Sequence, residues 1–211
     1  MKYVILCNAD NVEPFTIPRQ LCYVKGETLI GRTVRLLKEN GVKNVLITTS
    51  DKRFKAYAPI YTPLYNDYKP KEGKGYWLDA FPVELLLEPI CFLLGDVYYS
   101  ENAIKTIVRT ETESVLFYCS YRNSDPRYIK HHDEPFGFKV QDCDIFKYHI
   151  EHVKRLFDQG KTGRHPIAWE LYRSLNNIDV NVHKMTENYV AINDETCDVD
   201  RLIDVDLLNM M

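Results

Sequence analysis

The chain has 211 residues, of which 45% are hydrophobic and 27% are charged. This composition suits one α/β domain with a full apolar core, and it excludes a disordered or collagen-like chain. The 27 basic and 30 acidic residues give a formal charge of −3, which argues against a nucleic-acid or anionic-membrane partner. Any anionic ligand must therefore be bound by local groups.

The sequence predicts a cytoplasmic protein without a membrane anchor. The longest apolar runs, such as 90–95, are far shorter than the roughly 20 residues that span a bilayer. Residues 1–10 lack the pattern of a secretory signal peptide. The six cysteines are scattered and form no CxxC pair, which is typical of reduced, buried thiols.

The first fifty residues have the pattern of a parallel α/β unit. Residues 3–7 form a continuous apolar run, 28–40 an amphipathic helix that ends at Gly41, and 42–49 a second run rich in β-branched residues. A crossover between parallel strands is almost always right-handed. This order predicts the start of a doubly wound, mostly parallel sheet.

The alternation continues along the chain, and no linker or internal repeat divides it. We expect further strands at 60–61, 90–95, 114–120, 136–140, 180–183 and 189–192. We expect further helices at 78–88, 101–109, 144–157, 166–175 and 199–208. The prediction is therefore a single α/β domain, 1–211.

Several segments match one enzyme family in order and spacing. Residues 18–21 (PRQL), 24–33 (VKGETLIGRT) and 36–45 (LLKENGVKNV) resemble its Pro-Lys-x-Leu segment and the turn, helix and strand that follow. Residues 93–99 (LLGDVYY) are similar to its Gly-Asp element, and 198–205 (DVDRLIDV) to its closing Asp-x-Asp element. The chain thus resembles nucleotidyltransferases of the MobA-like or sugar-phosphate type, whose fold is also used by GT-A glycosyltransferases.

The resemblance implies a magnesium-dependent enzyme. It would join a nucleoside monophosphate from a nucleoside triphosphate, with CTP slightly favoured, to a small phosphorylated acceptor, and release pyrophosphate. The acceptor would be a sugar phosphate or a phospho-alcohol used in surface polysaccharide or lipid assembly. Residues 1–120 would form the nucleotide-binding core and 121–211 the acceptor side with a closing helix. Whether the enzyme forms a homodimer is left open by the resemblance.

Three aspartates are the candidate magnesium ligands. Asp96 follows an apolar strand, Asp200 precedes the last helix, and Asp198 shares a face with Asp200 if the segment is extended. Magnesium binds through one or two carboxylates while it keeps water and phosphate oxygens. The alternative is that Asp96 caps the helix near Ser100 and that the other two interact with the dipole of the tail helix.

The loop after the first strand departs from the family. Family members have a Gly-x-Gly-x-Arg core there, whereas this loop contains neither glycine nor arginine. The resemblance implies nucleotide contacts by Asn8, Ala9, Asp10 and Asn11, and the alternative is a plain connector. Arg19 stands at the family's lysine position.

Basic residues supply the remaining candidates. The resemblance implies that Arg19 and Lys25 are the catalytic cations. Lys74 and Gly75 lie in a lysine- and glycine-rich loop that either contacts the nucleotide or is a solvated face.

The acceptor site is expected at the start of a later helix. Arg164 and His165 open that helix and would contact the acceptor, unless the helix only packs through Trp169 and Leu171.

Two other functions remain as alternatives. A nucleotide-sugar glycosyltransferase would carry Asp-x-Asp after the central strand, and residues 95–98 (GDVY) lack it. A catalytically silent binding module would explain the loss of glycines from the first loop.

Overall fold

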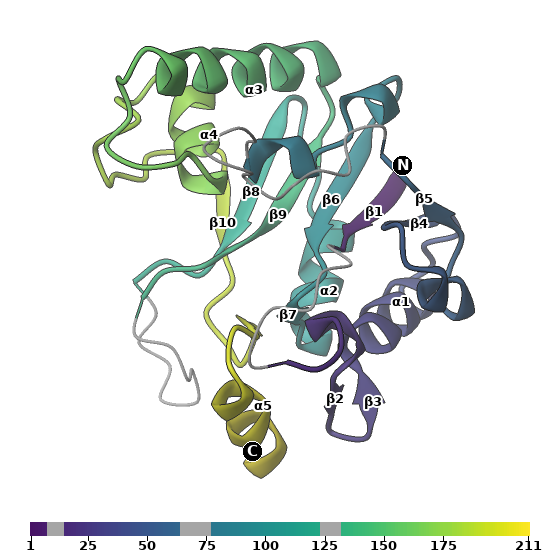
Figure 1. Cartoon of the computed structure of the whole chain (residues 1–211). Coiled ribbons are helices and arrows are strands. Elements are labelled where there is room, and N and C mark those ends of the chain that lie inside the picture. The colour runs from purple at the N-terminus through teal and green to yellow at the C-terminus, as the bar shows by residue number, and fades with distance from the viewer. Residues whose placement is uncertain (8–14, 64–76, 123–131) are drawn as a thin grey trace.

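The computed structural model describes residues 1–7, 15–63, 77–122 and 132–211, and within them a seven-stranded sheet forms the centre of the molecule (Figure 1). The strand order is β10-β8-β9-β6-β1-β4-β5. The strands are β1 (Lys2–Leu6), β4 (Val45–Thr48), β5 (Ile60–Tyr61), β6 (Ile90–Leu94), β8 (Val115–Cys119), β9 (Pro135–Val140) and β10 (Tyr189–Ala191). Strand β9 is antiparallel to β6 and β8, and the other neighbours in this sheet are parallel. The predicted doubly wound, mostly parallel α/β fold is confirmed.

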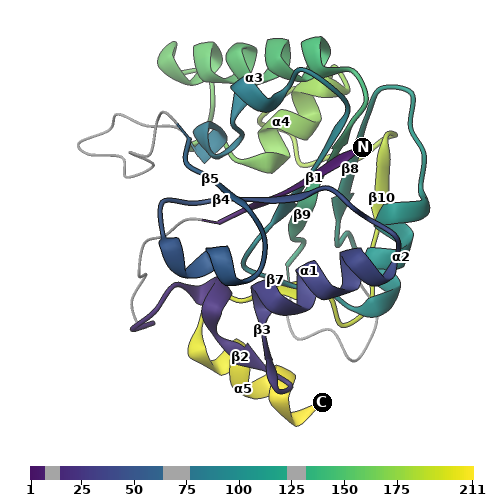
Figure 2. The same cartoon turned by 90° about the vertical axis from the view of Figure 1, so that its right-hand side faces the viewer.

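Helices cover both faces of the sheet (Figure 2). Helices α1 (Leu29–Glu39) and α2 (Glu101–Arg109) share one apolar core with one face, and α3 (Cys143–Asp158) and α4 (Ala168–Leu175) share a second core with the other. Successive side chains of β1 alternate between these cores, so Ile5 packs in the first and Val4 in the second. A strand buried on both faces has a continuous apolar sequence, as residues 3–7 do.

A smaller group of elements lies beside the sheet. Strands β2 (Tyr23–Val24) and β3 (Glu27–Thr28) form a hairpin, and β7 (Val97–Tyr98) pairs antiparallel with β11 (Cys197–Asp198). Helix α5 (Leu202–Met210) packs against them through a third apolar core. Strands β3, β7 and β11 were not expected from the sequence, because two-residue strands leave almost no periodic pattern.

Two of the predicted secondary-structure elements are wrong. Residues 78–88 do not form one helix but two short 3₁₀ segments, η3 (Trp77–Ala80) and η4 (Val83–Leu85). Pro82 lies between them, and proline lacks the N–H that a continuous helix needs.

Residues 180–183 form a turn instead of a strand. The backbone N–H of Asn181 donates to Asp179 Oδ1 at 2.8 Å, and that of Val182 donates to the Asp179 carbonyl oxygen at 3.0 Å. The Asp179 side chain thus supplies a turn in which the β-branched residues cannot pair. The tail helix also begins later than expected, at Leu202, because Asp198 belongs to β11.

Among the helices of the described ranges, none has the length and apolar character needed to cross a bilayer.

Candidate active site

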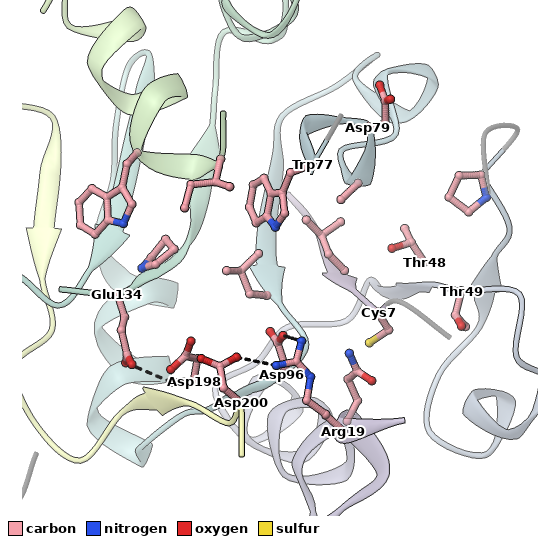
Figure 3. Close-up of a pocket in the computed structure, with 18 of the residues that line it drawn as sticks. Cys7, Arg19, Thr48, Thr49, Trp77, Asp79, Asp96, Glu134, Asp198 and Asp200 are labelled. Carbon is pink, nitrogen blue, oxygen red and sulfur yellow. Dashed lines mark hydrogen bonds and ion pairs between the residues drawn. The ribbon is translucent and has the colours of Figure 1, made fainter. Parts of the chain in front are cut away.

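A cavity of about 440 Å³ lies at the carboxyl ends of β1, β4 and β6 (Figure 3). In open α/β sheets this edge is where ligands bind. The charged and aromatic side chains on its wall include Arg19, Asp96, Glu134, Arg164, Asp198, Asp200, Trp77 and Trp169. Several of the predicted site residues are therefore brought to one place.

Gly95 places Asp96 at this cavity. Its backbone N–H donates to the Leu6 carbonyl oxygen at 2.9 Å, which continues the parallel pairing of β6 with β1 by one residue. A Cβ atom at position 95 would lie 2.5 Å from Cys7 Sγ and 2.7 Å from the Leu6 oxygen. Only glycine fits this close approach to the end of β1, and Asp96, the next residue, lines the cavity.

The β7–β11 ribbon brings two distant parts of the sequence together. Asp198 is the register partner of Val97, and the Val199 N–H donates to the Asp96 carbonyl oxygen at 2.8 Å. Asp96, Asp198 and Asp200 consequently share the same end of the cavity, as Figure 3 shows.

Arg19 connects two of these aspartates. It belongs to a 3₁₀ turn, η1 (Arg19–Leu21), that follows Pro18. Its Nη2 is 3.0 Å from Asp96 Oδ2 and its Nη1 is 2.5 Å from Asp200 Oδ1. Nη1 also donates to the Val199 carbonyl oxygen at 3.3 Å. One guanidinium thus bridges both carboxylates.

Burial and charge act against each other at these groups. Burial raises the pKa of Asp96, the Arg19 guanidinium opposes that rise, and the carboxylates of Asp198 and Asp200 reinforce it. Burial alone would lower the pKa of Arg19, but Asp96 and Asp200 together raise it above its ordinary value. Arg19 therefore stays charged and balances part of the acidic cluster.

The alternative capping roles of the aspartates are filled by other residues. The Ser100 hydroxyl accepts from the Ala103 N–H at 2.9 Å at the start of α2. Asp204 Oδ2 accepts from the Arg201 N–H at 2.9 Å at the start of α5. Asp96 is thus not needed as the cap of α2, while Asp200 lies two residues before α5, where its interaction with the helix dipole stays an alternative.

The donor chemistry of the aspartates fits magnesium, although their present arrangement holds Arg19. Carboxylate oxygens are the ligands that magnesium prefers, and it needs only one or two of them. Within the part of the chain that the structure describes, no group of three or more His, Cys, Asp or Glu residues is arranged to hold a metal ion. The guanidinium lies where such an ion would meet Asp96 and Asp200.

Lys25, expected to be a catalytic cation, lies outside the cavity. It forms the β2–β3 turn with Gly26, both with positive φ, and its N–H donates to Asn209 Oδ1 at 2.7 Å. Its Nζ is 3.6 Å from Glu195 Oε2 and 5.3 Å from the centre of the Tyr98 ring. The geometry gives Lys25 a role in packing the hairpin against α5.

The two expected acceptor contacts separate in the structure. Arg164 lines the cavity, and its Nε is 2.8 Å from Oε1 of the buried Glu170. The His165 ring packs on Phe157, with ring centres 4.9 Å apart, and does not line the cavity. The remaining expected contacts, Asn8, Ala9, Asp10, Asn11, Lys74 and Gly75, lie outside the described residues.

Glu134 is a cavity residue that the sequence analysis missed. Its side chain is 1% exposed, its Oε2 accepts from the Asp198 N–H at 3.2 Å, and its Oε1 is 3.7 Å from His132 Nε2. Glu134 directly precedes β9, and the start of an antiparallel strand lies at the carboxyl edge of its parallel neighbours. Sequence reasoning that follows only the ends of strands therefore overlooks it.

Thr48 and Thr49, at the end of β4, also line the cavity. The same rule that selected Asp96, a polar residue just after a buried strand, could have found them.

Comparisons with known proteins agree with this architecture. No family model matches the sequence. A bifunctional IPC transferase and DIPP synthase of Thermococcus kodakarensis is 29% identical over 102 residues, which are 44% of this chain and 22% of that protein. The chain thus matches less than a quarter of the length of this relative.

Two solved structures share the fold over nearly the whole chain. CTP:phosphocholine cytidylyltransferase from Streptococcus pneumoniae superposes with a TM-score of 0.54 at 14% identity, covering 99% of this chain and 97% of that one. CMP:2-keto-3-deoxy-manno-octonic acid synthetase, in a complex with CTP, gives a TM-score of 0.60 at 13% identity, covering 99% and 96%. The chain therefore shares the fold of these two enzymes over nearly its whole length.

Proposed function

We propose that the protein is a magnesium-dependent nucleotidyltransferase that transfers a nucleoside monophosphate from a nucleoside triphosphate to a small phosphorylated acceptor. The observation that carries the proposal is the convergence of Arg19, Asp96, Asp198 and Asp200 in a cavity at the carboxyl ends of the central strands. The fold shared with two CTP-linked enzymes favours CTP as the donor.

The reaction sets clear demands on these residues. An oxygen of the acceptor phosphate forms a bond to the α-phosphorus, the bond from that phosphorus to the bridging oxygen breaks, and pyrophosphate leaves with the electron pair. Negative charge must be balanced throughout, and Arg19, at the acidic end of the cavity, would supply positive charge for this purpose. Magnesium held by Asp96 and Asp200, with Asp198 nearby, would neutralise triphosphate oxygens.

The two substrates would occupy opposite walls of the cavity. The nucleotide would lie over the ends of β1 and β4, where Thr48 and Thr49 offer hydroxyl groups. The acceptor would lie against the wall formed by Trp77, Trp169 and the residues before β9, with Arg164 as its phosphate contact. A cavity of about 440 Å³ in total favours a small acceptor, such as a sugar phosphate or a phospho-alcohol.

The direct test is pyrophosphate release by the purified chain. Each of the four nucleoside triphosphates is combined with magnesium and with a panel of sugar phosphates and phospho-alcohols. We expect turnover with one preferred nucleotide and one acceptor class, and a fall in kcat on the order of a hundredfold in Asp96→Asn. Asp144→Asn is the control, because that carboxylate is 96% exposed on α3 and should leave kcat unchanged.

A silent binding module is the outcome that would replace this proposal. Calorimetric titration of the wild-type chain with each triphosphate, with and without magnesium, measures binding independently of turnover. If no triphosphate bound at millimolar concentration, the enzyme proposal would fail. If one bound without pyrophosphate release from any acceptor, the chain would be a nucleotide-binding module.

A further inference from the structure

The place of a cation in the acidic end of the cavity is taken by one of the chain's own side chains. The Arg19 guanidinium uses both of its terminal nitrogens there, Nη2 toward Asp96 at 3.0 Å and Nη1 toward Asp200 at 2.5 Å. The exposed fractions of the three side chains are 19% for Arg19, 25% for Asp96 and 45% for Asp200. Asp96 is the less exposed of the two carboxylates, so it gains the most from a compensating charge.

The guanidinium and a divalent ion cannot both occupy this position. Arg19 already contacts Asp96 Oδ2 and Asp200 Oδ1, and a divalent ion bound to the same two carboxylates would lie next to the guanidinium, where two cations repel each other. The Arg19 backbone is fixed by its turn, since the Leu21 N–H donates to the Pro18 oxygen at 2.8 Å and the Cys22 N–H to the Arg19 oxygen at 2.9 Å. Any exchange must therefore occur by rotation of the Arg19 side chain.

We propose that Arg19 is an internal counter-ion that is exchanged for the metal when the triphosphate arrives. This inference rests on the proposed function, because the metal and the triphosphate belong to it. Without nucleotide, Arg19 neutralises Asp96 and Asp200 and thereby competes with a metal ion. With nucleotide, the phosphate oxygens offer Arg19 a new anionic partner, and the two carboxylates become available to the metal.

The exchange makes metal and nucleotide binding depend on each other. By thermodynamic linkage, if the triphosphate strengthens metal binding, the metal strengthens triphosphate binding by the same factor. The nucleotide-free chain should bind a divalent ion weakly, even though three aspartates lie at the site. Arg19 would thus keep the site from binding metal before its substrate is present.

The test is titration of the nucleotide-free full chain with Mn²⁺, with free Mn²⁺ measured by electron paramagnetic resonance. Arg19→Gln should bind Mn²⁺ at least about tenfold more tightly than the wild type, because the competing cation is gone. Arg35→Gln is the matched control, since it removes one arginine paired with Glu27 and Glu39 on α1 and should leave Mn²⁺ binding unchanged. The double variant Arg19→Gln, Asp96→Asn should lose the gain.

A second measurement determines how Mn²⁺ changes the affinity for the nucleotide. The affinity of the wild type for CTP should rise at least about tenfold when Mn²⁺ is added, and this gain should shrink in Arg19→Gln. Without nucleotide, the Mn²⁺ affinity of Arg19→Lys should lie between that of the wild type and that of Arg19→Gln. An ammonium group contacts the two carboxylates less completely than the planar guanidinium does.

Two results would overturn the exchange. One is a folded Arg19→Gln chain, with the melting curve of the Arg35→Gln control, that binds Mn²⁺ no more tightly than the wild type. The other is CTP binding to the wild type without any gain from Mn²⁺. A tighter Mn²⁺ site in Arg19→Gln, in a chain that binds no triphosphate, would support the counter-ion role and refute the nucleotidyltransferase.

Discussion

At the scale of single residues, Arg19 is the cation that contacts two carboxylates of the site. The resemblance of residues 18–21 to a family segment predicted a cation there, but the sequence did not indicate which carboxylates it meets. The structure supplies them, Asp96 and Asp200. An arginine in place of lysine matters here, because its planar fork contacts two carboxylates at once.

Replacing Arg19 tests its part in the reaction. Its contact with the phosphates should strengthen as charge builds up at the transferring phosphorus, so Arg19→Ala should lower kcat by a factor on the order of a hundred. Arg19→Lys should recover activity. Steady-state kinetics with saturating magnesium and nucleotide measure both variants. An Arg19→Ala enzyme with wild-type kcat would remove this residue from the catalytic groups.

Gly95→Ala tests how closely the residue after β6 approaches the end of β1. The added methyl group would lie 2.5 Å from Cys7 Sγ and 2.7 Å from the Leu6 carbonyl oxygen, and the backbone oxygen cannot move without disturbing β1. We expect the free energy of unfolding to fall by about 1–3 kcal/mol in urea denaturation. Gly163→Ala is the control, because its Cβ would lie an ordinary 3.4 Å from Asn181 Oδ1. Equal stability of the two variants would contradict this account.

His149 gives the fold a pH dependence. Its Nδ1 is 2.8 Å from Ser174 Oγ between α3 and α4, and burial lowers its pKa below the ordinary value of 6.5, with a smaller contribution from His152. The unfolded chain then binds the proton more readily, so stability should decrease as pH falls from 6.5 through the lower pKa of the folded state.

Thermal melting as a function of pH measures this effect. His149→Gln should remove the part of the Tm decrease that occurs below pH 6.5. Ser174→Ala keeps the imidazole half-buried and should retain that decrease, because burial is its main cause. An unchanged pH profile in His149→Gln would assign the decrease to other groups.

At the scale of elements, short pieces of structure decide where the site forms. The β7–β11 ribbon has only two residues in each strand, yet it joins the Asp96 segment to the Asp198 segment. Helix α2 starts three residues after the end of β7, and Ser100, the residue just before the helix, is held from both sides. The Ser100 N–H donates to Thr196 Oγ1 at 3.0 Å, and the Ser100 hydroxyl donates to Asp194 Oδ2 at 2.7 Å.

Ser100→Ala tests this junction. The substitution removes the side-chain cap of α2, which accepts from the Ala103 N–H, and the hydrogen bond to Asp194. We expect a loss of about 1 kcal/mol in the free energy of unfolding, measured by urea denaturation. Ser100→Thr keeps a hydroxyl group and should lose clearly less. If the two variants were equally unstable, the hydroxyl would not be the stabilising group.

At the scale of the whole molecule, the cavity is assembled from segments that span the chain. Residues from β1, η1, β4, η3, the end of β6, the start of β9, α4 and β11 all reach it. A ligand that contacts so many elements should stabilise the folded state as a unit, because it binds no comparable site in the unfolded chain.

A thermal-shift panel tests this directly. With the four nucleoside triphosphates and magnesium, we expect one nucleotide, CTP, to raise Tm the most. At a ligand concentration of a hundred times Kd, the stabilisation amounts to about 2.7 kcal/mol. Asp96→Asn should reduce the shift, and Asp144→Asn should not. Equal shifts for all four nucleotides would contradict a base-selective site.

Much of the fold follows from the sequence alone. The continuous apolar runs of β1 and β6 and the amphipathic patterns of α1 and α2 are local signals, and these four elements were found close to their expected bounds. Asp96 was selected for the same reason, since a polar residue after a buried strand lies at the ligand-binding edge. These predictions need only local periodicity and a general rule of topology.

Only the tertiary structure decided the composition of the site. The antiparallel direction of β9 brings Glu134 to the cavity, and the β7–β11 ribbon brings Asp198 there, while the packing of the hairpin keeps Lys25 away. Strand direction and long-range pairing depend on contacts between segments far apart in the sequence, which local patterns do not encode. The bridge from Arg19 to Asp96 and Asp200 arises in the same way, because its three charges meet only when distant segments pack together.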